Sequence, residues 1–118
     1  LWRTCRKRAY LMVYVPDRGD VVWIDFDPVL GHEQGGHRPA LVISPQAYNK
    51  TVGLMLCCPM TTKIKGYPFE VEIAGATKNV ALSDQITCVD WKTRKIAYKD
   101  KATTIEIDLV RSTLKVLI

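Results

Sequence analysis

The stretch GHEQGGHRPALVIS, residues 31–44, joins a polar, glycine-rich segment directly to a continuous apolar run. The run ALVIS predicts a buried strand, and Pro39 at its head fits the strand's first position because proline cannot donate to a ladder. The three glycines ahead of it allow positive φ or a close approach of the backbone to another group. This pattern predicts a loop that delivers side chains to a site, although many ordinary turns are built in the same way.

Further short runs on both sides of this stretch predict a small sheet. GDVVWIDFD, residues 19–27, reads as a strand with one fully apolar side. Its inward side consists of Val22, Ile24 and Phe26, and its outward side of Val21, Trp23 and Asp25. GLMLCCPMTT, residues 53–62, predicts a third, mostly buried strand. FEVEIA, residues 69–74, alternates cleanly, and NVALSDQITCVDW, residues 79–91, predicts one or two more strands interrupted near Ser83.

The end of the chain changes to a helical period. Thr103 and Glu106 have the spacing of a capping box, in which each side chain caps the backbone N–H of the other residue. Apolar residues then recur at helical spacing, namely Ile107, Val110, Leu114 and Leu117. Five or more short strands followed by one helix predict a mainly β fold, a small and strongly bent antiparallel sheet or barrel closed by that helix.

Length and composition fit a single soluble domain. The chain has 118 residues, 47% of them hydrophobic, which is enough for one modest core. No apolar run approaches the ~20 residues that span a bilayer. The first eleven residues, LWRTCRKRAYL, are basic but lack the apolar region of a signal peptide. We interpret residues 1–11 as a leader or non-native remnant, expected to be disordered, and residues 12–118 as the domain.

The net charge belongs mostly to that leader. The formal charge of +5 is 17 basic minus 12 acidic residues, and residues 1–11 contain four of the basic residues and none of the acidic ones. Residues 12–118 therefore carry 13 − 12 = +1. Their overall charge gives no indication for or against a nucleic-acid partner.

The four cysteines form no metal signature. Cys57 and Cys58 are adjacent in a predicted strand and should point to opposite faces, while Cys5 and Cys88 stand alone. Reduced, partly buried thiols of a cytosolic protein are therefore expected, rather than zinc ligands or disulfides.

Several polar residues are candidates for a site, and each has an ordinary structural alternative. Arg38 could hold an anion with its rigid guanidinium or pair with a surface carboxylate. Thr61 and Thr62 could be functional or simply strand residues. His32 and His37 lack a third ligand at a convincing spacing, so exposed loop histidines are favoured over a metal site.

The acidic candidates are no more decisive. Glu33 and Asp84 could be acid–base groups or solvated loop carboxylates. From the residues alone, the chain is a small β-rich domain with a polar cluster of open purpose.

Taken together, these stretches are more specific than their parts. The order GDVVWIDFDP, GHEQGGHRPALVIS, CPMTTKIKGYPFEVEI, VALSDQI and a terminal helix ending in KVLI resembles the MazF/PemK family of toxins, closest to the chromosomal MazF type. These proteins are the mRNA interferases of bacterial toxin–antitoxin pairs. The resemblance covers about residues 13–118 and leaves residues 1–11 outside, which supports the interpretation of the latter as a leader.

The resemblance implies an SH3-like small β-barrel with a C-terminal helix, in agreement with the predicted strands. It also implies a toxin of a type II toxin–antitoxin system that acts as a sequence-specific, metal-independent endoribonuclease with no cofactor. Such an enzyme cleaves single-stranded mRNA to 2′,3′-cyclic phosphate and 5′-hydroxyl ends, and so inhibits translation and growth.

The resemblance also carries over individual residues. The family's catalytic Arg and Thr fall on Arg38 and Thr61, and the Glu of its GHEQ loop is Glu33. Because arginine keeps its proton at neutral pH, Glu33 or His32 is better suited as the general base. Further contacts with RNA are expected from Gly35, Gly36, His37, Thr62, Lys63, Lys65, Asp84 and Gln85.

The chain departs from part of the family at one position. In plasmid-encoded PemK-type relatives an Arg, thought to help catalysis, stands two positions before the Asp of the strand matching VALSDQ, whereas this chain has Leu82. The catalytic scheme of that branch therefore does not carry over whole, and Asp84 is a substrate-contact candidate only.

Two other functions stay open at this point. The same fold serves a toxin that poisons gyrase by binding, and a non-catalytic RNA-binding barrel is a further alternative. The expected partners are single-stranded RNA, an acidic antitoxin and a second copy of the chain, with no membrane and a cytoplasmic location. The homodimer is expected to bury the apolar helix at residues 104–117 together with outward residues such as Val21 and Trp23.

Overall fold

The computed structural model describes residues 14–27, 35–75 and 78–118. Its strands are β2 (Asp20–Asp25), β3 (His37–Val42), β4 (Leu54–Thr61), β5 (Glu70–Ile73), β6 (Asn79–Leu82), β7 (Thr87–Asp90) and β8 (Ala97–Lys101). Its helices are α2 (Gln46–Val52), the short 3-10 helix η1 (Ser83–Gln85) and α3 (Thr104–Leu117). The interpretation of residues 1–11 as a leader lies outside the described residues.

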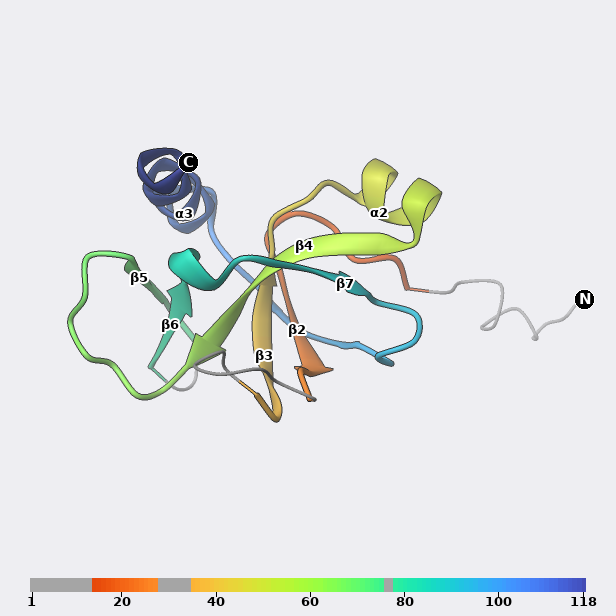
Figure 1. Cartoon of the computed structure of the whole chain (residues 1–118), viewed down its shortest axis with the longest axis horizontal. Helices are drawn as coiled ribbons and strands as arrows, with labels where there is room; N and C mark the ends of the chain where they lie inside the picture. The colour runs from red at the N-terminus through yellow and green to blue at the C-terminus, as the bar shows by residue number, and fades with distance from the viewer. Residues whose placement is uncertain (1–13, 28–34, 76–77) are drawn as a thin grey trace, which may run out of the picture.

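The sheet is arranged around β4 (Figure 1). The hydrogen-bonded order is β5-β6-β4-β3-β2-β8, with every pair antiparallel, and β7 also pairs with β4. The same edge of β4 pairs with β7 over residues 54–57 and with β6 only at Met60 and Thr61, so the sheet turns along this strand. The resulting half-barrel sheet with a C-terminal helix confirms the predicted fold class.

Both faces of the central strands are buried, which corrects one prediction. On one face, a core cluster contains Val22, Ile24, Phe26, Ala40, Val42, Met55, Cys57, Val89 and Trp91. On the other face, Val21 packs in a second cluster that includes Val110 and Leu114 of α3. Val21 is 2% exposed, so its predicted outward position is wrong. The physical reason is that α3 packs on this side of the sheet, which the local alternation of a strand does not indicate.

Pro39 also differs from its predicted position. β3 begins at His37, so Pro39 is its third residue and lies opposite Trp23 of β2. Proline is tolerated there because the pairing of β3 with β4 begins only at Ala40, opposite Pro59. The prediction that Pro39 heads the strand is therefore wrong by two residues.

The capping box at the start of α3 is confirmed. The Thr103 hydroxyl oxygen accepts the Glu106 N–H at 3.2 Å, and the Thr103 N–H donates to the Glu106 carboxylate at 2.9 Å. The second carboxylate oxygen of Glu106 accepts the N–H of Ala74 at 2.6 Å. One side chain thus starts the helix and fastens it to the segment that follows β5.

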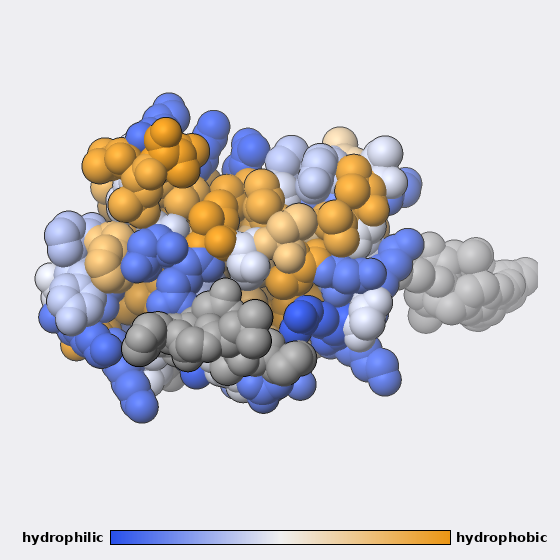
Figure 2. All heavy atoms as spheres, in the orientation of Figure 1, coloured by the Kyte–Doolittle hydropathy of each residue, from blue (hydrophilic) through white to orange (hydrophobic). Residues whose placement is uncertain are grey.

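α3 leaves much of its apolar surface outside the core. Val110 and Leu114 are buried against the sheet. Ile105, Leu109, Val116, Leu117 and Ile118 are exposed, and Leu117 is among them although it follows the predicted apolar spacing. Figure 2 shows apolar side chains gathered over this helix.

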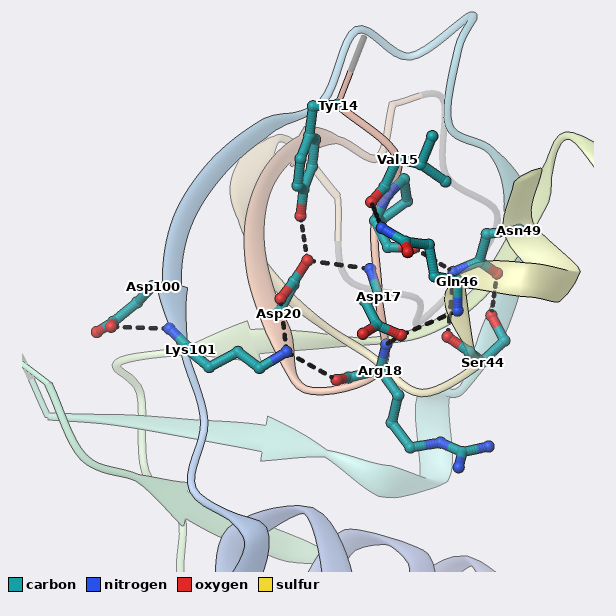
Figure 3. Close-up of polar contacts among 11 residues, drawn as sticks. Tyr14, Val15, Asp17, Arg18, Asp20, Ser44, Gln46, Asn49, Asp100 and Lys101 are labelled. Carbon is teal, nitrogen blue, oxygen red and sulfur yellow. Dashed lines mark hydrogen bonds and ion pairs between the residues drawn. The ribbon is translucent and has the colours of Figure 1, made fainter. Parts of the chain in front are cut away.

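A buried polar network joins the segment before β2 to α2 (Figure 3). The side-chain amide of Asn49 donates to the carbonyls of Pro16 at 2.8 Å and Ser44 at 3.0 Å, and its oxygen accepts the Ser44 hydroxyl at 2.5 Å. The backbone carbonyl of Asn49 accepts the indole N–H of Trp91 at 3.0 Å. Asn49 therefore joins the segment before β2, Ser44 and Trp91 through its side chain and its backbone carbonyl.

Asp20 forms the neighbouring part of the network (Figure 3). Its carboxylate accepts the Tyr14 hydroxyl at 2.5 Å and the Asp17 N–H at 3.0 Å, and it pairs with the Lys101 ammonium at 2.9 Å. Burial of the phenol, reinforced by its bond to Asp20, raises the pKa of Tyr14 above the usual value for tyrosine. The start of the described chain is thereby fixed to β8.

The thiols lie as the alternation of a strand requires. Cys57 and Cys58 are free, buried and on opposite faces of β4, while Cys88 is free and exposed. Burial raises the pKa of Cys58 to about 12 and also raises the pKa of Cys57. Both buried sulfurs are therefore neutral thiols at physiological pH.

We predict that Asn49→Ala lowers the free energy of unfolding by roughly 2–3 kcal/mol, because it leaves buried carbonyls without their donor. Urea denaturation measures this loss, with the denaturant slope unchanged. Lys50→Ala is the matched control, since Lys50 is the exposed next residue of the same helix and should stay within about 0.5 kcal/mol of the parent. An Asn49→Ala variant as stable as this control would show that the network is dispensable.

Candidate functional site

A groove of about 920 Å³ lies where β2, β3, β4 and η1 converge. Its basic lining residues are Arg38, Lys63, Lys65 and Lys99, and its acidic ones are Glu70 and Asp84. Its aromatic and imidazole rings come from Trp23, His37, Tyr67 and Phe69. Its other polar side chains are those of Thr61, Thr62, Asn79 and Gln85. Such a mixture suits a ligand with both charged and ring-shaped parts.

Arg38 is held by two backbone carbonyls. Its Nε–H donates to the Gly35 carbonyl at 2.7 Å, and its Nη1 donates to the Met60 carbonyl at 3.4 Å. Arg38 itself is paired with Ile24 in the β2–β3 ladder, so its backbone is fixed as well. A guanidinium has five N–H donors, so these two bonds leave others to bind an anion in the groove.

A tight turn precedes Arg38. Gly36 has φ +79°, a conformation that favours glycine, and its N–H donates to the Asp27 carboxylate at 2.9 Å. Its carbonyl accepts the N–H of Phe26 at 3.0 Å. Gly35 and Gly36 are not among the groove-lining residues. Their role in the described structure is to shape the turn and to hold the Arg38 side chain.

Thr61 lies on the groove wall as the last residue of β4. Its hydroxyl oxygen accepts the N–H of Lys63 at 3.1 Å. Because a hydroxyl that accepts a hydrogen bond still carries its own proton, Thr61 can donate to a bound oxygen. Met60, whose carbonyl holds Arg38, is the residue directly before Thr61. Arg38 and Thr61, two of the four residues predicted to be catalytic, are thus brought to the same groove.

Glu70 fixes the loop that follows β4. Its carboxylate accepts the N–H of Lys65 at 3.2 Å and the N–H of Gly66 at 2.9 Å. Gly66 has φ +80°, so the loop turns at the point where the carboxylate binds it. The exposed side chains of Lys63 and Lys65 are consequently presented on an ordered backbone.

Ring surfaces lie on two parts of the groove lining. The rings of Trp23 and His37 are stacked with centroids 5.5 Å apart and planes within 6°, and the Lys99 ammonium lies 5.5 Å from the centre of the Trp23 ring. Tyr67 and Phe69 form a second pair with centroids 5.3 Å apart. Rings of this kind can stack on flat ligands such as nucleic-acid bases.

Asp84 and Gln85 come to the groove from η1. Partial desolvation raises the pKa of Asp84 above its usual range, and the charge of Glu70 raises it further. Two carboxylates would repel a phosphate, so they suit the donor groups of a ligand rather than its anionic part. Leu82, also on the wall, is nearly fully buried and adds an apolar contact.

Most of the predicted site residues with described positions meet here. The groove contains Arg38, Thr61, His37, Thr62, Lys63, Lys65, Asp84 and Gln85. Glu33 and His32 lie outside the described residues. Six polar or aromatic lining residues were not predicted from the sequence, namely Trp23, Tyr67, Phe69, Glu70, Asn79 and Lys99. A basic and aromatic composition near the other candidates could have indicated Lys99 and Tyr67, whereas Trp23 was assigned to an outer surface.

Two further observations bear on cofactors and membranes. Among residues 14–27, 35–75 and 78–118, no three His, Cys, Asp or Glu side chains are grouped as metal ligands would be. No helix in the described part of the chain is both long enough and apolar enough to cross a membrane.

Comparison with known proteins identifies the family. Residues 17–118 match the family described as "PemK-like, MazF-like toxin of type II toxin-antitoxin system". The chain is 48% identical over 106 residues to the endoribonuclease toxin MazF of Escherichia coli strain K12, a match that covers 89% of this chain and 96% of that protein. It is 32% identical over 84 residues to the endoribonuclease PemK of Escherichia coli, covering 66% of this chain and 63% of that protein.

Solved structures agree with this match. MazF from Deinococcus radiodurans has a TM-score of 0.86 and 46% identity, over 89% of this chain and 97% of that chain. A MazE–MazF structure from the same organism has a TM-score of 0.79 and 46% identity, over 89% and 96% of the two chains. The chain belongs to the PemK-like, MazF-like family of type II toxins. The predicted fold, family and toxin class are therefore confirmed.

We predict that Glu70→Ala frees the loop after β4. Losing hydrogen bonds to a charged acceptor, each worth about 1.5–3 kcal/mol, should speed amide hydrogen exchange at Lys65 and Gly66 by about tenfold to a hundredfold. Glu72→Ala is the matched control, because Glu72 is an exposed glutamate of the same strand whose partner, Lys78, lies 3.8 Å away on the surface. Equal exchange at both amides in the two variants would contradict the assigned role of Glu70.

Proposed function

We propose that this toxin is a metal-independent endoribonuclease that cleaves single-stranded mRNA at short sequences and so stops translation and growth. The observation that carries the proposal is the Arg38 guanidinium, held by two carbonyls in a groove that also contains the Thr61 hydroxyl. The endoribonuclease names of the E. coli relatives support it.

The proposed reaction uses the nucleophile that RNA itself carries. The 2′-oxygen forms a bond to the adjacent phosphorus as the bond from phosphorus to the 5′-oxygen breaks, giving a 2′,3′-cyclic phosphate and a 5′-hydroxyl. The 2′-hydroxyl proton passes to a general base, and a proton is delivered to the leaving 5′-oxygen. Because the nucleophile is already in place, the reaction requires no metal-bound water.

The site residues divide these roles among them. Charge on the phosphate oxygens grows in the transition state, so Arg38 stabilises it through its remaining N–H donors, and Thr61 donates to a non-bridging oxygen. Glu33 or His32 takes the proton of the 2′-hydroxyl, since an arginine keeps its own proton at neutral pH.

Recognition of the RNA uses the rest of the groove. Lys63, Lys65 and Lys99 attract the phosphates, and unpaired bases stack on the rings of His37 and Tyr67. Thr62, Asp84 and Gln85 contact base edges, where carboxylates accept hydrogen bonds from amino groups. Gly35 and Gly36 contribute by shaping the turn that holds Arg38.

The function test is cleavage of a single-stranded RNA in excess EDTA. We expect full activity there and products that end in a 2′,3′-cyclic phosphate and a 5′-hydroxyl. Loss of cleavage that Mg²⁺ or Zn²⁺ restores would contradict the proposed chemistry. Binding to gyrase without any RNA cleavage would instead favour the alternative function of a toxin that poisons gyrase. RNA binding without cleavage would favour a non-catalytic RNA-binding barrel.

The same cleavage assay tests the roles proposed for Arg38 and Thr61. Arg38→Ala should lower kcat by about 10²–10³ with a smaller effect on binding, because its charge is needed most in the transition state. Arg38→Lys should restore little, since the fork of the guanidinium is lost. Thr61→Val should act in the same direction more mildly. Full activity in Arg38→Ala would assign the reaction to another site.

We further propose a C2 homodimer and an acidic antitoxin as partners, in the cytoplasm. The exposed apolar side chains of α3 favour a second copy, although the buried Val21 takes no part in such a surface. Because Arg38, Lys63 and Lys65 make the groove cationic, a disordered acidic antitoxin segment can occupy it in place of RNA.

The proposed homodimer and antitoxin lead to one joint prediction. The toxin should sediment as a dimer at micromolar concentration, and an acidic antitoxin peptide should inhibit it competitively with RNA. Raised salt should weaken this inhibition, because it screens the charges. Sedimentation as a monomer would contradict the proposed dimer. A peptide that binds equally well while RNA occupies the groove would contradict competitive inhibition.

A further inference from the structure

Pro39 has no backbone N–H, and a donor at this position would face a carbonyl of β4. Next to the last pair of the β2–β3 ladder, the Phe26 N–H donates to the Gly36 carbonyl, so the even-numbered residues of β3, beginning with Arg38, direct their backbone groups to β2. On the other edge the Ile43 N–H donates to the Leu56 carbonyl, so the odd-numbered residues of β3 direct theirs to β4. Pro39 is one of these.

The register of β3 and β4 identifies the carbonyl that receives no backbone hydrogen bond from residue 39. Ala40 is opposite Pro59 and Leu41 is opposite Cys58, so the next pair in the same register is residue 39 with Met60. In a regular ladder the N–H of residue 39 would donate to the Met60 carbonyl. Proline has no N–H, and the described β3–β4 pairing ends at Ala40.

The Met60 carbonyl instead accepts Nη1 of Arg38, at 3.4 Å. Met60 lies between Pro59 and Thr61 on β4, so this bond brings the guanidinium beside the end of the strand that carries the Thr61 hydroxyl. The Gly35 carbonyl holds the other side of the guanidinium through Nε at 2.7 Å. The orientation of Arg38 thus uses an acceptor that any residue other than proline at position 39 would compete for.

We propose that Pro39 is a positioning residue for the reaction: by lacking an N–H, it keeps the Met60 carbonyl for Arg38 and ends the β3–β4 ladder at the groove. The inference rests on the proposed function, because it takes Arg38 as the group that stabilises the phosphate. It differs from a packing role, which would depend on the ring of Pro39 and not on its missing donor.

The test variants restore a backbone N–H at position 39. In Pro39→Ala the new N–H should bond to Met60, extend the ladder by one pair and turn the guanidinium away. Misplacing a catalytic group by about 1 Å can cost about 10²-fold, so we expect kcat to fall by about tenfold to a hundredfold with little change in KM. Nuclear magnetic resonance should show the new amide protected from hydrogen exchange. Pro39→Val, which restores the same N–H on a strongly strand-forming residue, should behave alike if Pro39→Ala folds poorly.

Pro59→Ala is the matched control. Pro59 is also buried in the sheet, on the facing strand, but it is not among the groove-lining residues and its nitrogen is directed to the edge of β4 away from β3. The Pro59→Ala variant should cleave RNA at the same rate as the parent protein, as measured under single-turnover conditions with excess enzyme.

A double-mutant cycle separates positioning from packing. Because Pro39 acts through Arg38, adding Pro39→Ala to Arg38→Ala should lower the rate no further than Arg38→Ala alone. Additive losses, an unprotected new amide or a full rate in Pro39→Ala would each overturn the inference while leaving the proposed function intact. A full rate in Arg38→Ala would overturn the inference together with the role that the proposed function gives to Arg38.

Discussion

The structure depends on the hydrogen bonding of β4 along both of its edges. One edge pairs with β3, and the other pairs first with β7 and then with β6. The change of partner falls between Cys57, the last residue paired with β7, and Met60, the first residue paired with β6. Because side chains alternate along the strand, β4 also contributes to both cores, and it ends at Thr61 in the groove. The turn of the sheet and the position of the candidate site are therefore consequences of one strand.

The groove is organised mainly by backbone acceptors and donors. Carbonyls of Gly35 and Met60 hold Arg38, and backbone N–H groups of the loop after β4 are held by Glu70. Anchors of this kind are stiff because each belongs to a strand or to a turn fixed by a glycine. A guanidinium placed in this way reorganises little when a phosphate gains charge, and that preorganisation is what electrostatic stabilisation of a transition state requires.

Features set by neighbours in the sequence were predictable. The capping box of Thr103 and Glu106, and the opposite directions of Cys57 and Cys58, follow from helical and strand periods alone. The grouping of Arg38 with Thr61 came from the family resemblance, since they are far apart in the sequence. Val21 was assigned wrongly because α3, more than eighty residues later, covers it. Trp23 was taken for outer surface because its neighbours, His37 and Lys99, reach it only through strand pairing.

The two buried thiols have a chemical consequence for the whole domain. Electrophiles and peroxides react with thiolates, and the apolar surroundings of Cys57 and Cys58 keep both sulfurs protonated as well as inaccessible. Oxidation can therefore reach these sulfurs only in a molecule whose sheet has already opened. Added oxygen on Cys57 or Cys58 would place a polar group in the core cluster that contains that residue, and this would oppose closure of that core. Oxidation of Cys57 and Cys58 is then limited by how often β4 is exposed, whereas the exposed Cys88 is accessible in the folded molecule.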